Sequence, residues 1–229
     1  ERFLIMKVKA LTLASVAGSL AMAGGASAAF TNITATVTSD IDIGGTLYDN
    51  FQIFVNYDNP ADQTIALGGT PNNQQVLNSG GGGFWQQTLF GTDTAYNPAF
   101  VMFDPNLIYD SYVTIGTVTS ADGMAPQFQS WNSTDFNTAD SATTTNGGWF
   151  LTPDDPETIS GGSSIVASFT VAAGNTVSGN FGQLQTVEDG VSMTRGGADT
   201  AFSFTRVPAP GTLALLGLAG LAGTRRRRA

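Results

Sequence analysis

The chain has 229 residues, with nine basic and 18 acidic side chains, no histidine and no cysteine. The lack of cysteine excludes disulfides and thiolate metal sites, and the lack of histidine excludes the Ser-His-Asp triad and the commonest zinc ligand. The stretch from Phe30 to Val207 contains 17 acidic residues and two basic ones, Arg195 and Arg206, which gives it a net charge of −15. A stretch this acidic repels nucleic acid and anionic lipid, so nucleic acid is not an expected partner.

The amino-terminal 28 residues have the organisation of a processing signal. Residues 1–5 precede the first methionine and are expected to be translated from upstream of the true start. Residues 6–28 combine a basic beginning, an apolar run from Ala10 to Ala23, and small residues at Ala26 and Ala28. This combination predicts a secretory signal peptide that signal peptidase cleaves after Ala28. The alternative is an amino-terminal helix that belongs to the core.

The middle of the chain is predicted to form strands. Alternating apolar and β-branched residues occur in six runs, at 30–39, 46–57, 111–120, 163–173, 175–187 and 200–207. The second run is expected to break at Asp49–Asn50, and residues 72–83 and 131–148 are expected to be loops. Short strands between turn residues, without long helical periodicity, predict an all-β fold. We expect a single antiparallel, jelly-roll-like β-sandwich over 29–206, flanked by an N-terminal signal helix and a C-terminal hydrophobic helix.

One acidic loop is a candidate metal site. The sequence TPDDPET places Asp154, Asp155 and Glu157 close together, and clustered carboxylates suit a hard cation such as calcium. Further carboxylates for such an ion come from two pairs, Asp40 with Asp42 and Asp58 with Asp62. The alternative is turn chemistry, because aspartate beside proline closes turns without any ion. No other cofactor is expected.

Three tryptophans are candidates for a sugar-binding platform. Trp85, Trp131 and Trp149 lie beside glycine-rich or polar stretches, where binding residues often occur. Their flat rings suit the faces of sugar rings, but aromatic residues of all-β domains also fill cores. A hydrolase using two carboxylates is a weaker alternative, because in so acidic a chain some pair meets by chance.

The carboxyl-terminal segment 207–229 combines three features in a fixed order. Pro208 and Pro210 come first and favour an extended backbone. Gly211 to Gly223 follows as an apolar run, which as a helix would reach about 20 Å and so fall short of a ~30 Å hydrocarbon core. Four arginines then end the segment, at Arg225, Arg226, Arg227 and Arg228, where the positive-inside rule holds them in the cytoplasm.

This segment resembles the PEP-CTERM sorting signal. Pro208 and Pro210 match the motif prolines and the four arginines match its basic end, whereas Ala209 stands where glutamate is usual. The resemblance implies transient anchoring in the inner membrane through 211–224 and processing by exosortase, an integral-membrane cysteine protease. It also implies delivery to the outer surface or extracellular matrix of a Gram-negative bacterium that secretes exopolysaccharide. The alternative is an ordinary membrane anchor that is never cut.

The sequence therefore predicts an exported, surface-sorted protein without enzymatic activity. Its expected role is structural or adhesive, in an extracellular polysaccharide or biofilm matrix. A carbohydrate-binding module with exposed tryptophans is the alternative. Without histidine, and without lysine in the middle of the chain, its many serines and threonines lack an ordinary activator.

Replacing Arg225–Arg228 together with glutamine is expected to abolish surface delivery, because the charges that stop the chain in the membrane are removed. Fractionation of producing cells, followed by detection of the protein on intact cells, measures this. Surface delivery equal to that of the unchanged protein would contradict the sorting hypothesis.

Overall fold

The computed structural model describes residues 30–119, 127–129, 141–144, 146–151 and 161–206. These residues form thirteen strands and three short 3₁₀ helices, and the part described contains no α-helix. The early strands are β1 (Phe30–Ile43), β2 (Thr46–Tyr57), β3 (Gln63–Gly68), β4 (Gln75–Asn78), β5 (Tyr112–Val113), β6 (Gln127–Gln129) and β7 (Ser141–Thr144). The later ones are β8 (Gly148–Phe150), β9 (Ser163–Ala172), β10 (Thr176–Asn180), β11 (Gln183–Glu188), β12 (Val191–Arg195) and β13 (Ala201–Thr205). The 3₁₀ helices are η1 (Pro98–Phe100), η2 (Pro105–Tyr109) and η4 (Gly197–Thr200).

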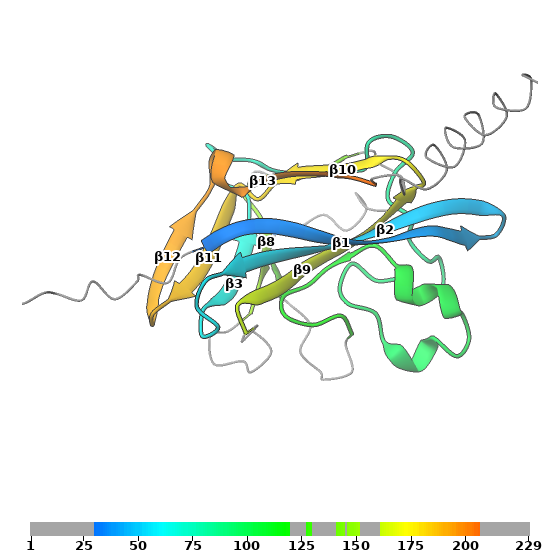
Figure 1. The fold of residues 1–229 in the computed structure, drawn as a ribbon, viewed down its shortest axis with the longest axis horizontal. Helices are drawn as coiled ribbons and strands as arrows, with labels where there is room; N and C mark the ends of the chain where they lie inside the picture. The colour runs from blue at the N-terminus through cyan, green and yellow to red at the C-terminus, as the bar shows by residue number, and fades with distance from the viewer. Residues whose placement is uncertain (1–29, 120–126, 130–140, 145, 152–160, 207–229) are drawn as a thin grey trace, which may run out of the picture.

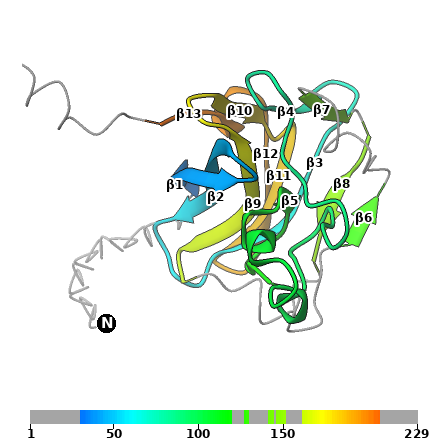
Figure 2. The ribbon, with the colours of Figure 1, turned by 90° about the vertical axis from the view of Figure 1, so that its right-hand side faces the viewer.

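The strands pair into three antiparallel sheets. Their orders are β1-β2-β9-β5, β13-β10-β4-β7 and β12-β11-β3-β8-β6. Long β1 and β2 form a hairpin across the molecule, and η1 and η2 lie together in the connection between β4 and β5 (Figures 1 and 2). The all-β, antiparallel prediction is confirmed. The two expected flanking helices lie outside the described residues.

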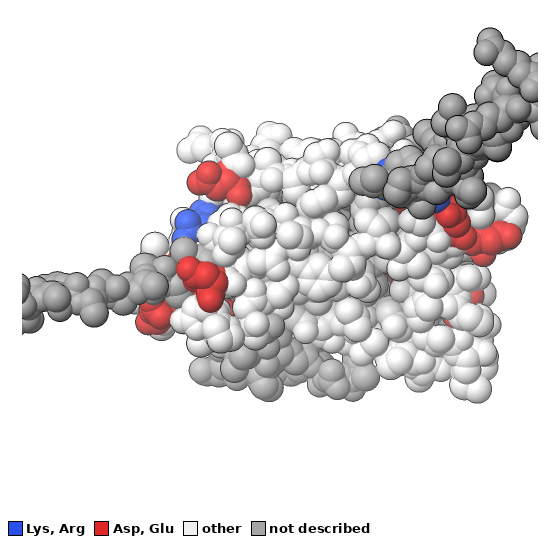
Figure 3. All heavy atoms as spheres, viewed as in Figure 1, with Lys and Arg blue, Asp and Glu red and all other residues white. Residues whose placement is uncertain are grey.

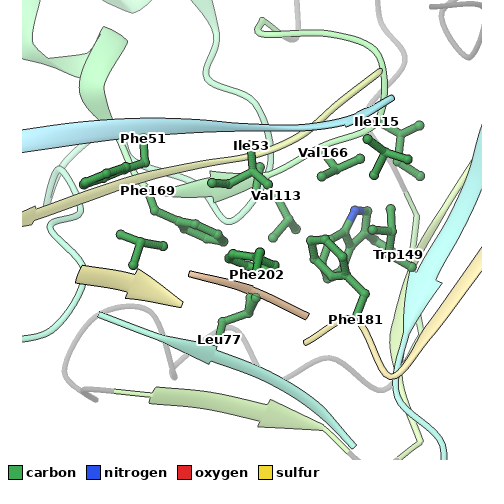
Figure 4. Close-up of a cluster of buried hydrophobic side chains, with 14 of the residues drawn as sticks. Phe51, Ile53, Leu77, Val113, Ile115, Trp149, Val166, Phe169, Phe181 and Phe202 are labelled. Atoms are coloured by element: carbon green, nitrogen blue, oxygen red, sulfur yellow. The ribbon is translucent and has the colours of Figure 1, made fainter. Parts of the chain in front are cut away.

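One hydrophobic core receives side chains from all three sheets. Phe51 and Phe169 come from the first sheet, Leu77 and Phe202 from the second, and Trp149 from the third (Figure 4). Phe51, Phe169 and Leu77 are fully buried. Burying a large apolar side chain contributes about 1.5–3 kcal/mol, so this shared core is what joins the three sheets.

Strand β9 is buried on both faces, which period-two alternation does not reveal. The apolar residues that alternate along the predicted run 163–173, Ile165, Ala167, Phe169 and Val171, are buried. Ser168 and Thr170, on the opposite face, are buried as well. The side-chain amide of Asn50 donates to both hydroxyls, over 2.9 Å to Ser168 and 2.8 Å to Thr170. These hydrogen bonds allow polar side chains to lie on the second buried face.

All three predicted interruptions are wrong, wholly or in part. Strand β2 runs without a break through Asp49 and Asn50, which pair with Val171 and Thr170 of β9 and are buried. The expected loop 72–83 contains β4, which pairs with β10, and the expected loop 131–148 contains β7, which pairs with β4. In each place a tertiary partner satisfies a polar sequence that taken alone favours a turn. The glycines that follow β4 do form a turn, since Gly80 to Gly83 all have positive φ.

Both arginines of the described chain are paired with carboxylates. Arg195 contacts the buried carboxylate of Glu188 at 3.0 Å. Arg206 binds Asp40 with both terminal nitrogens and lies 3.6 Å from the buried carboxylate of Asp49. On the face shown in Figure 3, acidic side chains gather at the two ends of the domain, and the area between them is largely uncharged.

Candidate functional site

The predicted tryptophan platform is not formed by Trp149. Its side chain is 1% exposed, and its ring meets Phe181 edge to face with centroids 6.1 Å apart. The indole N–H donates to the carbonyl oxygen of Thr114 over 3.0 Å. A ring enclosed on all sides offers no face to a sugar, so the assignment of Trp149 to a platform is wrong. Trp149 fills the core, which was the alternative interpretation.

The other two tryptophans do not complete a platform in the described part of the chain. Trp85 is half-buried, its backbone N–H donates to Thr170 over 2.7 Å, and its ring centroid lies 6.2 Å from that of Tyr48. Trp131 lies outside the described residues. The assignment of Trp85 and Trp131 to a sugar-binding platform therefore stays a prediction.

The candidate calcium ligands are separated by the fold. Asp154, Asp155 and Glu157 lie outside the described residues. Asp40 is paired with Arg206, and Asp42 accepts the backbone N–H of Gly45 over 2.8 Å, which is turn chemistry. Asp58 and Asp62 lie at the other end of β2. Within the ranges that the structure describes, no three acidic residues converge as a metal centre.

The proposed processing residues also lie outside the described chain. These are Ala26, Ala28, Pro208, Pro210 and Arg225 to Arg228. Among the residues described, no helix has the length and apolar character needed to cross a membrane.

A groove of about 370 Å³ lies on the five-stranded sheet, over strands β3, β8 and β11. The register places three rows of residues across these strands. The middle row, Leu184–Leu67–Trp149, points into the core, and each of its members is at most 1% exposed. Because side chains alternate along a strand, the two flanking rows face the opposite side of the sheet. These rows are Gln185–Ala66–Phe150 and Gln183–Gly68–Gly148.

Small residues on the central strands create the floor of the groove. Ala66, Gly68 and Gly148 leave a depression between the glutamines of β11 and Phe150 of β8. A Cβ atom on Gly148 would lie 2.1 Å from the carbonyl oxygen of Leu67, and one on Gly68 would lie 2.7 Å from that of Gly147. Real contacts of this kind are never so short, so β3 and β8 pair at this spacing only because both positions are glycine.

The described lining of the groove combines polar and apolar residues and carries no charge. None of the described residues that line it is ionisable, although the chain from Phe30 to Val207 has a net charge of −15. Gln183 and Gln185 are half-buried, Phe150 is half-buried, and Asn146 and Thr70 lie at the glycine-rich end. Amide side chains both donate and accept hydrogen bonds, and a phenyl ring offers an apolar face. This combination suits a neutral ligand with many hydroxyl groups.

Sequence reasoning missed the groove because its signal is distributed over three distant segments. No single stretch contains a motif, and the glutamines of β11 are indistinguishable from ordinary exposed strand residues. The available signal is the alternation around Trp149, which predicts that Gly148 and Phe150 face away from the core. Identifying the partner strands requires the register.

A second feature missed from the sequence is the polar network that shapes the connection between β4 and β5. The buried carboxylate of Asp110 accepts the backbone N–H groups of Gln87, over 2.8 Å, and Thr92, over 3.0 Å. The side chain of Gln87 in turn donates to Asp104 over 3.0 Å. This network holds a loop whose outer side chains are apolar and exposed, with Leu89 79%, Met102 80% and Phe103 67% exposed.

No protein-family model matches the chain, and no curated protein and no solved structure shows significant similarity to it. The assignment of function therefore depends on the residues and their geometry.

The pKa of Asp110 gives a test of the loop network. Burial raises this pKa from 3.8 to about 7, and the N–H groups of Gln87, Thr92 and Ser111 offset only part of the rise. The folded state therefore binds more protons than the unfolded state between pH 4 and 7, so the contribution of Asp110 is greatest at acid pH and is lost as the pH rises through 7. The difference in unfolding free energy between the wild type and Asp110→Asn should fall over this range, by at most about 1.4 kcal/mol per pH unit.

Urea unfolding of both proteins at several pH values between 4 and 8 measures this difference. The comparison cancels the contributions of the other acidic groups, which both proteins share. A difference that is constant with pH, or that grows between pH 4 and 7, would contradict the assignment.

Proposed function

We propose that this chain is an exported, non-enzymatic protein of an extracellular polysaccharide matrix that binds a neutral polysaccharide in the groove over β3, β8 and β11. The observation that carries the proposal is a groove with a glycine floor whose described lining includes amide side chains and no charge, in a strongly acidic chain. Carbohydrate binding is the alternative function that the sequence predicts, and we assign it to this groove and not to the tryptophans.

The chemistry of the lining favours sugar hydroxyls over other ligands. Gln183 and Gln185 present donors and acceptors on one side, and Phe150 presents a ring on the other. An anionic polysaccharide or a nucleic acid would find no cation among the lining residues that the structure describes, and the acidic chain would repel it. A neutral glycan encounters neither obstacle.

The same lining supports binding rather than hydrolysis. Glycoside hydrolysis ordinarily needs two carboxylates on either side of the scissile bond. None of the described residues that line the groove is a carboxylate. These residues therefore include neither a general acid nor a nucleophile of the usual kind.

The setting in which this binding takes place is part of the proposal. We interpret the antiparallel sheets around one core as a jelly-roll-like sandwich. A processing signal precedes it in the sequence, and a second one follows it. The signal peptide 6–28 directs export, and the PEP-CTERM-like segment 207–229 provides transient anchoring and surface delivery by an exosortase-type protease. The domain then lies at the outer surface of a Gram-negative cell, within reach of the polysaccharide of the extracellular matrix.

Ala66→Phe is the sharpest test of the proposed site. It fills the floor of the groove between Gln185 and Phe150 and leaves the polar lining side chains in place, so binding to neutral polysaccharide should be lost. Gln185→Ala should weaken binding about fivefold, since one hydrogen bond is worth about 1 kcal/mol. The measurement is co-sedimentation with cellulose, chitin and starch, and affinity electrophoresis in dextran and in alginate.

Gln52→Ala is the matched control, because Gln52 is a half-buried glutamine on β2, in a different sheet. It should bind as the wild type does. Equal binding by Ala66→Phe and the wild type, or binding to alginate alone, would overturn the proposal.

A further inference from the structure

An acidic cluster lies at the end of the five-stranded sheet. Asp58 and Asp62 belong to the connection between β2 and β3, and Glu188 and Asp189 lie where β11 turns into β12. The two connections touch, because the backbone N–H of Asp189 donates to Oδ1 of Asp62 over 3.2 Å. The side-chain amide of Asn59 also donates to Oδ1 of Asp189 over 3.2 Å.

Asp62 is the unusual member of this cluster. Its side chain is fully buried, and its second oxygen, Oδ2, has no hydrogen-bond partner among the residues that the structure describes. Glu188, also buried, is paired with Arg195, so its charge is compensated. Burial raises the pKa of Asp62, the N–H of Asp189 partly opposes this, and the charges of Asp189, Glu188 and Asp58 raise it further. A buried carboxylate oxygen without a partner is costly, and native proteins rarely keep one without a reason.

We propose that a calcium ion binds between these two connections, with Oδ2 of Asp62 and the carboxylate of Asp189 as its charged ligands. The buried, unpartnered oxygen supplies the ligand, and the surrounding acidic side chains supply the negative field that attracts a divalent cation. Calcium fits better than zinc, because the chain has no histidine or cysteine. It fits better than magnesium, because calcium accepts the irregular oxygen geometry that two loops provide.

The affinity implied by this site is modest. No three acidic side chains converge as a metal centre in the described ranges, so backbone carbonyls and water would complete the coordination. Sites of this kind in extracellular modules have dissociation constants on the order of 10⁻⁴–10⁻³ M. The ion would join the ends of β3 and β11, the strands that supply Ala66, Gly68, Gln183 and Gln185 to the groove. The proposal does not depend on the groove binding a glycan.

Thermal unfolding of the full chain in 10 mM CaCl₂ and in EGTA tests the site. The calcium concentration is about 10–100 times the expected dissociation constant, so the wild type should gain about 3–10 °C in Tm. Asp62→Asn should lose most of this gain. In EGTA it should be at least as stable as the wild type, because the substitution removes a buried charge. A purely structural aspartate would give the opposite result in EGTA.

Asp42→Asn is the matched control, because it removes the same charge from an exposed turn at the other end of β2. It should keep the full calcium-dependent gain, and 10 mM MgCl₂ should give a smaller gain in the wild type. Asp189→Asn is the second variant, should Asp62→Asn fail to fold, and it too should reduce the gain. Equilibrium dialysis should give one bound calcium ion per wild-type chain.

Two outcomes would overturn the proposal. One is the absence of any calcium-dependent change in the wild type. The other is an equal change in the wild type, Asp62→Asn and Asp189→Asn, which would show that calcium only screens the net negative charge.

Discussion

The close pairing of β3 with β8 is the constraint on which the proposed site depends. Side chains at Gly68 and Gly148 would collide with the backbone of the neighbouring strand, at 2.7 and 2.1 Å respectively. The same two glycines leave the outer face of the sheet empty at its centre. On the inner face, this spacing brings Leu67 and Trp149 together in the core. The need for glycine at these two positions therefore has two consequences. It allows the core to pack closely on one face of the sheet, and it leaves the floor of the groove on the other.

The distribution of charge complements this arrangement. The described arginines are paired with Glu188 and with Asp40 and Asp49, and none of the described residues that line the groove is ionisable. A strongly acidic chain gains solubility from its charge, and at the same time its own charge excludes anionic ligands from its surface. A groove with this described lining therefore favours neutral ligands in two ways. Its side chains can contact them, and the negative charge of the chain repels anionic competitors. The calcium ion we propose would offset part of the repulsion at one end of the same sheet.

Local patterns were sufficient to predict the fold class and the longest strands. The alternation in β9 and β2 gave the buried sets around Phe169 and Phe51, because those faces contact the core directly. The same reasoning failed at Asp49–Asn50 and at β4, where tertiary partners satisfy polar residues that favour turns locally. It also failed at Trp149, because a neighbouring glycine is typical of a binding loop. Gly148 is instead required by the close contact between β8 and β3, which only the register of the strands reveals.

Hydrogen exchange of the full chain, with and without a soluble neutral oligosaccharide such as cellohexaose, tests the central claim most directly. Bound ligand should slow the exchange of backbone amides in β3, β8 and β11, because it covers the groove and restrains the strands that form it. Exchange in the loop held by Asp110 should not change. Protection confined to that loop, or no protection at saturating oligosaccharide, would contradict the account.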